Sequence, residues 1–320
     1  MSKKIKLTFQ KIYQRILEKS YVYLKKDLII KAYQYGRLGN NIQQFLLLVA
    51  HFKVFGANFT LDNKFIKSYE QDINFKALPG FIEINNKSNR KIISNKILIK
   101  NNMYLYTRFY QKFFRNSFMS NRVFRDAYLS KNKFLSLLPE LVEDIRPALK
   151  NFILSKEINN IKIHQRNDIC VLHLRGGDTI PPQNLNHISN PISYYRWLNK
   201  YYKSIIIVHE PSTLNPIINE LYKIFDVKKT ISSSLKNDFA LIANSKNVAT
   251  SGVGTFAISA CLFNKKIKNL FYSDAFLNEH INPNFISNRV KKHCYLLGRE
   301  FYIKWAMANP QERLKLVYKF

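Results

Sequence analysis

The order of apolar segments is the feature that most limits what this chain can fold into. From Leu28 onward, short β-rich runs alternate with longer segments whose apolar residues recur at helical spacing, and this alternation occurs in two blocks. Strands separated by helical segments of about ten to fifteen residues indicate βαβ units and therefore parallel sheets. At 320 residues the chain can form two such domains, each with its own core. We expect an α/β protein with two Rossmann-like domains and a cleft between them.

Residue type and spacing predict the elements of each block. The first block predicts strands at 28–35, 58–61, 81–84 and 97–99, a helix at 40–55, and mostly helical structure over 104–154. The second predicts strands at 169–174, 204–208, 248–251 and 267–272, with helices at 191–202, 214–225, 236–244 and 255–263. We expect four parts: a basic amphipathic helix at 1–27, α/β domains at 28–160 and 161–295, and a C-terminal helix at 296–320.

The net charge of the chain indicates which kinds of partner it attracts. Lys and Arg number 51 against 21 Asp and Glu, which gives a net charge of +30. So basic a chain is attracted to polyanions such as anionic lipid, nucleic acid or acidic glycan. Near the N-terminus, Ile5, Phe9, Ile12 and Ile16 fall on one helical face flanked by basic residues. Such a helix either lies in an anionic membrane interface or packs on the domain behind it, and the sequence leaves both readings open.

Several sequence signals bear on location and on metals. No segment reaches the roughly 18 apolar residues that a membrane span needs, and the N-terminus lacks a signal-peptide pattern. We therefore expect a cytoplasmic protein, bound peripherally to the inner face of the plasma membrane if the first helix is interfacial. The three cysteines are far apart without a CxxC pair, and neither a DxD motif nor a metal-spaced His/Cys cluster is present. The sequence predicts neither a disulfide framework nor a metal site.

The first polar motif is the turn GRLGNN between a predicted strand and a predicted helix. Gly36 and Gly39 permit the backbone to approach a ligand closely. Asn40 is placed to cap the helix, and Arg37 is placed to reach toward a ligand. A capped turn without any chemistry has the same pattern, so both readings stay open. The motif is not a phosphate-binding P-loop, because the GxxxxGK[ST] pattern is absent.

The second motif, HLRGGD, directly follows an apolar strand. Packing alone rarely places His, Arg, two glycines and Asp at the end of a strand. The period-two alternation of a strand points His173 and Arg175 to the same side. The guanidinium fork suits a pyrophosphate, and its charge would stabilise a departing diphosphate. Asp178 would orient Arg175 or hold the loop. The alternative is a loop ion pair beside a core histidine.

The third motif is DFALIANS, followed by SGVGTF. Asp238 begins a predicted helix, where it is either the N-cap or a ligand to a nucleoside, and Phe239 comes next. At SGVGTF a predicted strand ends and a helix begins. The hydroxyls of Ser251 and Thr255, together with backbone N–H groups at a helix start, predict a site for an anion.

In this order and at these separations, the three motifs resemble those of the bacterial α-1,2-fucosyltransferases. They also resemble the wider fucosyltransferase superfamily, which includes the protein O-fucosyltransferases. The resemblance runs from about Lys31 to Phe276 and includes the phrase NPISYY at 190–195. It implies a metal-independent, inverting enzyme of the GT-B fold that uses GDP-fucose. In such an enzyme the second domain binds the donor and the acceptor approaches from the first.

The resemblance also implies roles for the motif residues. Arg175 matches the first arginine of the family's HxRRGD motif, which contacts the donor diphosphate. Gly176 stands where the family has a second arginine that helps to select GDP-fucose, and Gly254 and Ala257 replace serines around the TF pair. His173 and Asp178 are candidates for the general base by residue type. The catalytic candidates are Arg175, His173, Asn40 and Arg37, and the donor-binding candidates are Asp178, Asp238, Phe239, Ser251, Thr255, Gly36 and Gly39.

The expected function is therefore the transfer of a sugar from a nucleotide-sugar donor, GDP-fucose, to a surface-glycan acceptor such as O-antigen, capsule or lipooligosaccharide, without a cofactor. Two other readings compete with it. The charge of +30 suggests a nucleic-acid-binding protein, although no RNA-recognition, zinc-finger or helix-turn-helix signature is present. The departures at Gly176 and Gly254 suggest an inactive scaffold that resembles a glycosyltransferase.

Overall fold

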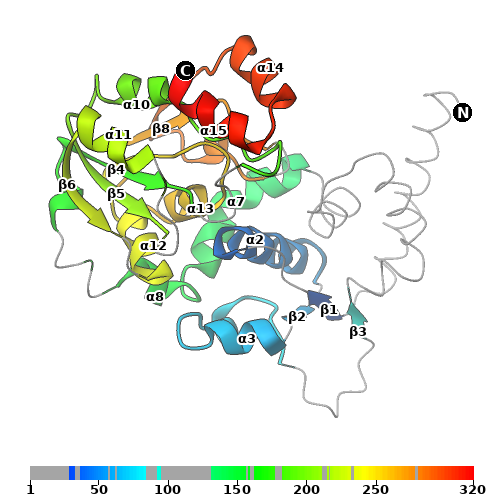
Figure 1. Cartoon of the computed structure of the whole chain (residues 1–320). Helices are drawn as coiled ribbons and strands as arrows, with labels where there is room; N and C mark the ends of the chain where they lie inside the picture. Colours follow the sequence, from blue (N-terminus) through cyan, green and yellow to red (C-terminus); the bar gives the residue numbers. More distant parts are fainter. Residues whose placement is uncertain are drawn as a thin grey trace, which may run out of the picture. The chain divides into compact units, whose positions relative to one another are not determined.

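The chain divides into two compact units, residues 1–149 and 150–320 (Figure 1). The computed structural model describes residues 29–32, 37–56, 58–61, 63–83, 92–94, 131–155, 158, 162–176, 182–210, 215, 217–231, 234–277 and 280–320. The predicted N-terminal helix at 1–27, the predicted strand at 97–99 and the helical prediction over 104–130 lie outside these residues. No helix within the described ranges is both long enough and apolar enough to cross a membrane.

The first unit contains, in its described residues, a parallel three-stranded sheet in the order β2-β1-β3. The helix α2 (Leu38–Phe55) connects β1 to β2 and so completes a βαβ unit. Phe45 on α2 makes edge-to-face contacts with Phe65 and Phe75, which form part of the core. The remaining elements named here are β1 (Ile29–Ala32), β2 (Asn58–Leu61), α3 (Asn63–Tyr69), β3 (Ile92–Ser94) and α7 (Lys131–Ile145).

The second unit is built on a parallel sheet whose six strands in the described residues follow the order β6-β5-β4-β7-β8-β9. Counted from β4, this is the order 3-2-1-4-5-6 of the doubly wound dinucleotide-binding fold. The order reverses between β4 and β7, which are hydrogen-bonded neighbours. The strands are β4 (Ile169–Leu174), β5 (Ser204–His209), β6 (Asp226–Ile231), β7 (Asn247–Ala249), β8 (Asn269–Ser273) and β9 (Lys291–Tyr295).

Helices pack on both faces of this sheet. On one face, Cys170 and Leu172 of β4 share a core cluster with α10, α11, α14 and α15. On the other, His173 contacts Phe256 of α13, and Phe239 of α12 contacts Phe152 of α8. The elements are α8 (Lys150–Ile153), α10 (Ile192–Leu198), α11 (Ile217–Ile224), α12 (Leu235–Ala243), α13 (Phe256–Leu262), α14 (Arg299–Met307) and α15 (Pro310–Lys319). The α/β class and a Rossmann-like sheet are thus confirmed.

Two strands of the second unit were not predicted, and the prediction of a single C-terminal helix was wrong. The edge strands β6 and β9 each carry a Lys-Lys pair, so neither has the uniform apolar composition of the inner strands. The segment 296–320 forms two helices because Asn309 and Glu312 make a capping box that starts α15, with Pro310 at its first turn. In the first unit, the predicted strand at 81–84 is reduced to an isolated bridge between Phe59 and Phe81.

We predict that Asn247→Ala lowers the free energy of unfolding by about 2 to 3 kcal/mol, since it leaves buried partners unpaired. The Asn247 side chain is 1% exposed, and its Nδ2 donates to the carbonyl oxygens of Ile169 (2.9 Å) and Asn167 (3.1 Å). Its Oδ1 accepts from Asn269 Nδ2 at 2.9 Å. Urea unfolding measures the change, with Asn219→Ala on the exposed face of α11 as control. Equal losses in the two variants would contradict the role of Asn247 in joining β4, β7 and β8.

Candidate functional site

The carboxyl ends of β4 and β7 define the candidate site, since ligands of open α/β sheets bind where the strand order reverses. Arg175 directly follows β4, and its backbone N–H donates to Ser251 Oγ at 2.8 Å. Its side chain turns toward the same segment, where Nη1 donates to the carbonyl oxygen of Val253 at 2.8 Å. Arg175 is therefore fixed at both backbone and guanidinium to the segment that follows β7. The structure thus brings Arg175 of the second motif against Ser251 and Val253 of the third.

Glycine is required at one position of the segment 251–254. Gly252 has φ = 108°, and a Cβ at this position would lie 2.2 Å from the carbonyl oxygen of Ile188. The same residue forms an antiparallel bridge with Ser189, so this segment lies directly against the chain that precedes α10. Gly254 differs, because a Cβ there would meet Arg175 Cδ at an ordinary 3.7 Å. The backbone therefore requires Gly252, whereas a Cβ at position 254 would make an ordinary contact with the Arg175 side chain.

Asparagine side chains hold the strand ends in place. Asn190 is fully buried; its Nδ2 donates to the carbonyl oxygen of Thr250 at 3.0 Å, and its Oδ1 accepts from Ser273 Oγ at 2.6 Å. Asn215 Nδ2 donates to the carbonyl oxygen of Arg175 at 2.9 Å. These bonds connect the ends of β4, β7 and β8. An amide side chain suits this task, because it can satisfy a buried carbonyl and a buried hydroxyl at once.

His173 lies one residue before the end of β4, and its ring centroid is 5.2 Å from that of Phe256. Burial, and secondarily the charge of Arg175, lower the pKa of His173 to about 4. The imidazole is therefore neutral at physiological pH. It is also a weak base, because its conjugate acid is as strong as a carboxylic acid.

The residues of the DFALIANS motif lie in α12. The helix begins at Leu235 and is capped by Ser234, whose Oγ accepts from the N–H of Asn237 at 3.2 Å. The N-cap reading of Asp238 was therefore wrong; this carboxylate lies in the first turn and is 6% exposed. Phe239 has no exposed surface, and its ring packs against those of Phe152, Phe256 and Phe263, so it forms part of the core.

Thr255 occupies the N-cap position of α13, but its hydroxyl makes no capping hydrogen bond. In the first unit, α2 begins at Leu38 with Arg37 at the N-cap position, so the expectation that Asn40 caps this helix was wrong. Asn40 lies in the first turn, where its N–H donates to the carbonyl oxygen of Arg37 at 2.9 Å. Arg37, Gly39 and Asn40 thus share one turn of the first unit. Gly36 and Asp178 lie outside the described residues.

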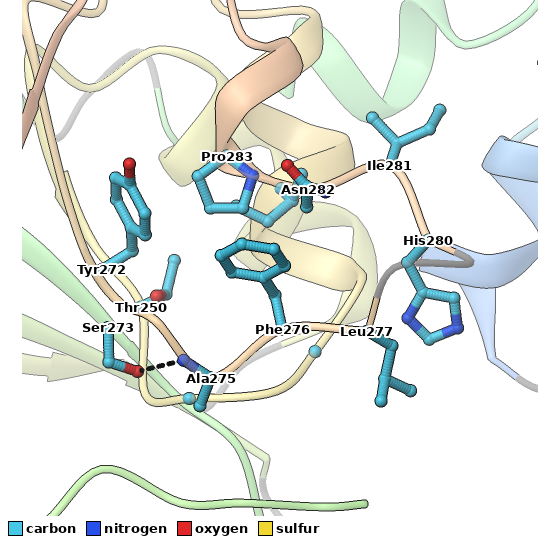
Figure 2. Close-up of a pocket in the computed structure, with 13 residues that line it drawn as sticks. Thr250, Tyr272, Ser273, Ala275, Phe276, Leu277, His280, Ile281, Asn282 and Pro283 are labelled. Atoms are coloured by element: carbon cyan, nitrogen blue, oxygen red, sulfur yellow. Dashed lines mark hydrogen bonds between the residues drawn. The ribbon is translucent and has the colours of Figure 1, made fainter. Parts of the chain in front are cut away.

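One pocket, which we call the β8 pocket, is lined by residues from the segments 250–258, 272–277 and 280–283 and has a cavity volume of about 10 Å³, room for about one water molecule. Figure 2 shows the ring of Phe276 beside Asn282 and Pro283, with Thr250 and Ser273 at the strand ends. The N–H of Ala275 donates to Ser273 Oγ at 3.4 Å. The sequence analysis missed these residues. For Ser273, Phe276 and Asn282, the signal that could have identified them was their place after the predicted strand at 267–272.

A second pocket, the Arg175 pocket, has a cavity volume of about 20 Å³. Arg175 and Ser251 line it from the strand ends and Tyr195 lines it from α10. Leu314, Val317 and Tyr318 of α15 line it as well. No sequence signal connects α15 with β4, so this pocket could be found only in the tertiary structure. No cluster of three or more His, Cys, Asp or Glu with the geometry of a metal site occurs among the described residues.

The strand order defines the second unit as a Rossmann-like α/β unit. No family model matches the chain, and no curated protein matches it in sequence. Several solved structures are similar to it at low identity. POFUT1 in complex with GDP is 11% identical, with 85% of this chain and 99% of that chain covered and a TM-score of 0.40. NodZ α-1,6-fucosyltransferase soaked with GDP-fucose is 12% identical, with 78% and 96% covered and a TM-score of 0.42. E. coli ADP-heptose lps heptosyltransferase II is 12% identical, with 91% and 97% covered and a TM-score of 0.38.

We predict a pH-dependent stability that depends on His173. Its folded pKa of about 4 lies below the ordinary value of 6.5, so the unfolded chain binds this proton more readily and acid favours unfolding. The contribution is complete above about pH 6.5 and is lost toward pH 4, with about 2 kcal/mol lost by pH 5. Urea unfolding of the wild type and of His173→Gln from pH 7.5 to 5 measures it. The stability difference between the two proteins should shrink on acidification, and a constant difference would contradict the prediction.

Proposed function

We propose that this chain is a GT-B-like, inverting glycosyltransferase whose second unit binds a nucleotide-sugar donor. The observation that carries the proposal is Arg175, which is fixed across the reversal point of the sheet by bonds to Ser251 and Val253. A guanidinium held in this way offers a preorganised positive charge at the edge where such folds bind ligands. The order of the three motifs supports the same assignment.

In this proposal Arg175 contacts the donor diphosphate. During transfer, the bond between the sugar's anomeric carbon and the phosphate oxygen breaks, and the nucleoside diphosphate leaves with the electron pair. The acceptor hydroxyl oxygen forms the new bond to the anomeric carbon, and its proton passes to the departing diphosphate. Because Arg175 is already held by Val253, its charge stabilises the departing diphosphate without a costly rearrangement. Because His173 is neutral, it adds no second positive charge next to the Arg175 guanidinium.

We propose GDP-fucose as the donor and a surface glycan as the acceptor, on the strength of the resemblance to the α-1,2-fucosyltransferases. The surface around the β8 pocket is our candidate contact for the nucleoside. It combines the ring of Phe276 with the polar groups of Thr250, Ser273 and Asn282, a mixture that matches the flat base and the hydroxyls of a nucleoside. Arg37 and Asn40 of the first unit are proposed to act on the acceptor side.

We predict that Arg175→Ala lowers the rate of transfer by on the order of a hundredfold or more, because the leaving diphosphate loses its charge partner. Arg175→Lys should restore little, since an ammonium cannot form the bidentate fork. Arg196→Ala, which removes the same charge from the exposed face of α10, is the control and should behave like the wild type. Transfer from GDP-[14C]fucose and the melting temperature are measured for each variant. Near-normal turnover in Arg175→Ala contradicts the role of Arg175. Binding of GDP without turnover in the wild type favours the inactive scaffold instead.

The surface of α14 supports a place of action at an anionic membrane. Leu296, Ile303 and Met307 are 73%, 48% and 83% exposed, which is unusual for large apolar side chains. Ile303 and Met307 are one turn apart, and exposed Arg299 precedes them on the same helical face. An apolar face with a basic neighbour on a chain of net charge +30 suits a bilayer with anionic headgroups. We propose that the enzyme meets lipid-linked acceptors by peripheral binding there.

Co-sedimentation with phosphatidylserine vesicles tests this surface. We predict binding of the full chain at low salt that high salt weakens, because the Debye length falls from about 30 Å at 0.01 M to 3 Å at 1 M. The double variant Ile303→Ser/Met307→Ser should bind several-fold less, and deletion of residues 1–20 should reduce binding further. Leu235→Ser, at another exposed apolar residue (43% exposed), is the control. If the full chain does not sediment with these vesicles at low salt, the membrane proposal is wrong.

A further inference from the structure

A cavity much larger than the two pockets at the strand ends lies along the outer side of α14, the helix beside α15 in Figure 1. Its volume is about 580 Å³, against about 10 and 20 Å³ for the β8 and Arg175 pockets. Sites for small molecules typically span about 300–1,000 Å³, so this cavity has room for an organic ligand. We call it the α14 groove. Its lining includes Asp274, Leu296, Arg299, Tyr302, Ile303 and Ala306.

The α14 groove follows the side of the helix that faces away from the core. Phe301 and Trp305 are 0% and 2% exposed and pack in the core of the second unit. Arg299, Ile303 and Ala306 recur on the opposite side of the helix at intervals of one turn. From residue 299 to residue 306 an α-helix rises by about 10 Å. The groove is therefore elongated, with a basic side chain in the first turn of α14 and apolar side chains beyond it.

The acidic side chain of the groove already has donors within the protein. Asp274 follows β8, and its Oδ1 accepts from the N–H of Leu297 at 3.0 Å. The hydroxyl of Tyr302 is hydrogen-bonded to the same carboxylate. These two bonds fix the end of β8 to the start of α14. Arg299, in contrast, is exposed and extends from the first turn of the helix. The charge that the groove offers to a ligand is therefore the guanidinium of Arg299.

The remaining lining is apolar and open to solvent. Leu296 is 73% exposed and Ile303 is 48% exposed, so a ligand can cover both side chains without any unfolding. Contact with such surfaces stabilises a complex by about 25 cal/mol for each Å² of apolar area removed from water. The groove thus combines an elongated apolar contact with one cation.

This combination favours one class of occupant over two others. A protein segment would bring backbone N–H and C=O groups that need partners, and apolar side chains cannot supply them. A second copy of this chain would bring another net charge of +30, which repels the first. A lipid with a phosphate requires only an apolar contact for its chain and a guanidinium fork for its oxygens.

We propose that the α14 groove binds a single lipid molecule, whose apolar chain lies along α14 and whose phosphate meets Arg299. This inference rests on the membrane contact proposed above and assigns a defined ligand to it. The lipid is either the carrier of the acceptor glycan or a phospholipid of the bilayer, since both consist of an apolar chain and a phosphate. The groove is independent of the donor, because Arg175 does not line it.

Titration calorimetry of the full chain with dodecyl phosphate, kept below its micelle concentration, tests the groove without a membrane. Inorganic phosphate lacks the chain and dodecyltrimethylammonium lacks the anion, so each should bind about tenfold more weakly or worse. Ile303→Ser should weaken the binding of dodecyl phosphate about tenfold, because apolar contact with the chain is lost. Arg299→Gln should weaken it severalfold at low salt and less at high salt, as expected for an exposed charge.

Met307→Ser is the matched control for Ile303→Ser. Met307 lies one turn further along the helix and is more exposed (83%), but it does not line the groove. It should leave the binding of dodecyl phosphate unchanged. Lys315→Gln, at an exposed position of α15, is the control for Arg299→Gln. All four variants should keep the melting temperature of the wild type, because each substitution is at the surface.

Equal losses in Ile303→Ser and Met307→Ser overturn the groove, since a general apolar surface would respond to both. If dodecyl phosphate does not bind while the chain sediments with phosphatidylserine vesicles, the groove is wrong and the membrane contact stands. If neither binds, both are wrong, and transfer from GDP-fucose still tests the glycosyltransferase separately. Farnesyl phosphate identifies the source of the lipid. Tighter binding than that of dodecyl phosphate assigns the groove to an isoprenoid carrier, and equal or weaker binding assigns it to a phospholipid.

Discussion

The adjacency of β4 and β7 is the constraint on which the rest of the second unit depends. These strands are hydrogen-bonded neighbours, although β5 and β6 lie between them in sequence. Because both run parallel, their carboxyl ends meet at one edge, and the Arg175 N–H reaches Ser251 Oγ across that edge. The side chain of Arg175 and the segment 251–254 therefore lie next to each other in the candidate site. Without it, the two motifs would be separate loops with no common chemistry.

Asparagine side chains stabilise the arrangement of these strands by hydrogen bonds to the backbone. Asn190, Asn215, Asn247 and Asn264 each donate to backbone carbonyls at or near the strand ends. In a low-dielectric interior an unpaired carbonyl is costly, so each amide replaces the water that a more open edge would need. A scaffold with few unsatisfied groups does not rearrange easily. That property suits a site whose chemistry depends on a preorganised guanidinium.

The net positive charge of the chain contributes little to the stability of this scaffold. Among the described residues, ion pairs such as those of Arg166 with Asp168 and Lys304 with Glu300 lie at the surface, where each contributes little to stability. The exposed basic residues are therefore expected to affect the binding partners of the chain more than its folding. Arg175 and Arg313 differ, because carbonyl oxygens hold both side chains and their positions are defined. Arg175 lies at the strand ends where we propose the donor binds, and Arg313 joins α15 to the segment that begins at Pro182.

The sequence by itself determined the α/β class, the helices α10 to α13 and the inner strands, because apolar runs and helical periodicity are local signals. It also identified Arg175 and Ser251 as chemically unusual strand ends. Only the tertiary structure decided that β6 and β9 complete the sheet, since edge strands need not be uniformly apolar. It likewise decided that Phe239 belongs to the core and that Tyr195 and α15 flank Arg175. Those facts depend on contacts between residues far apart in sequence, which no local pattern of residue types encodes.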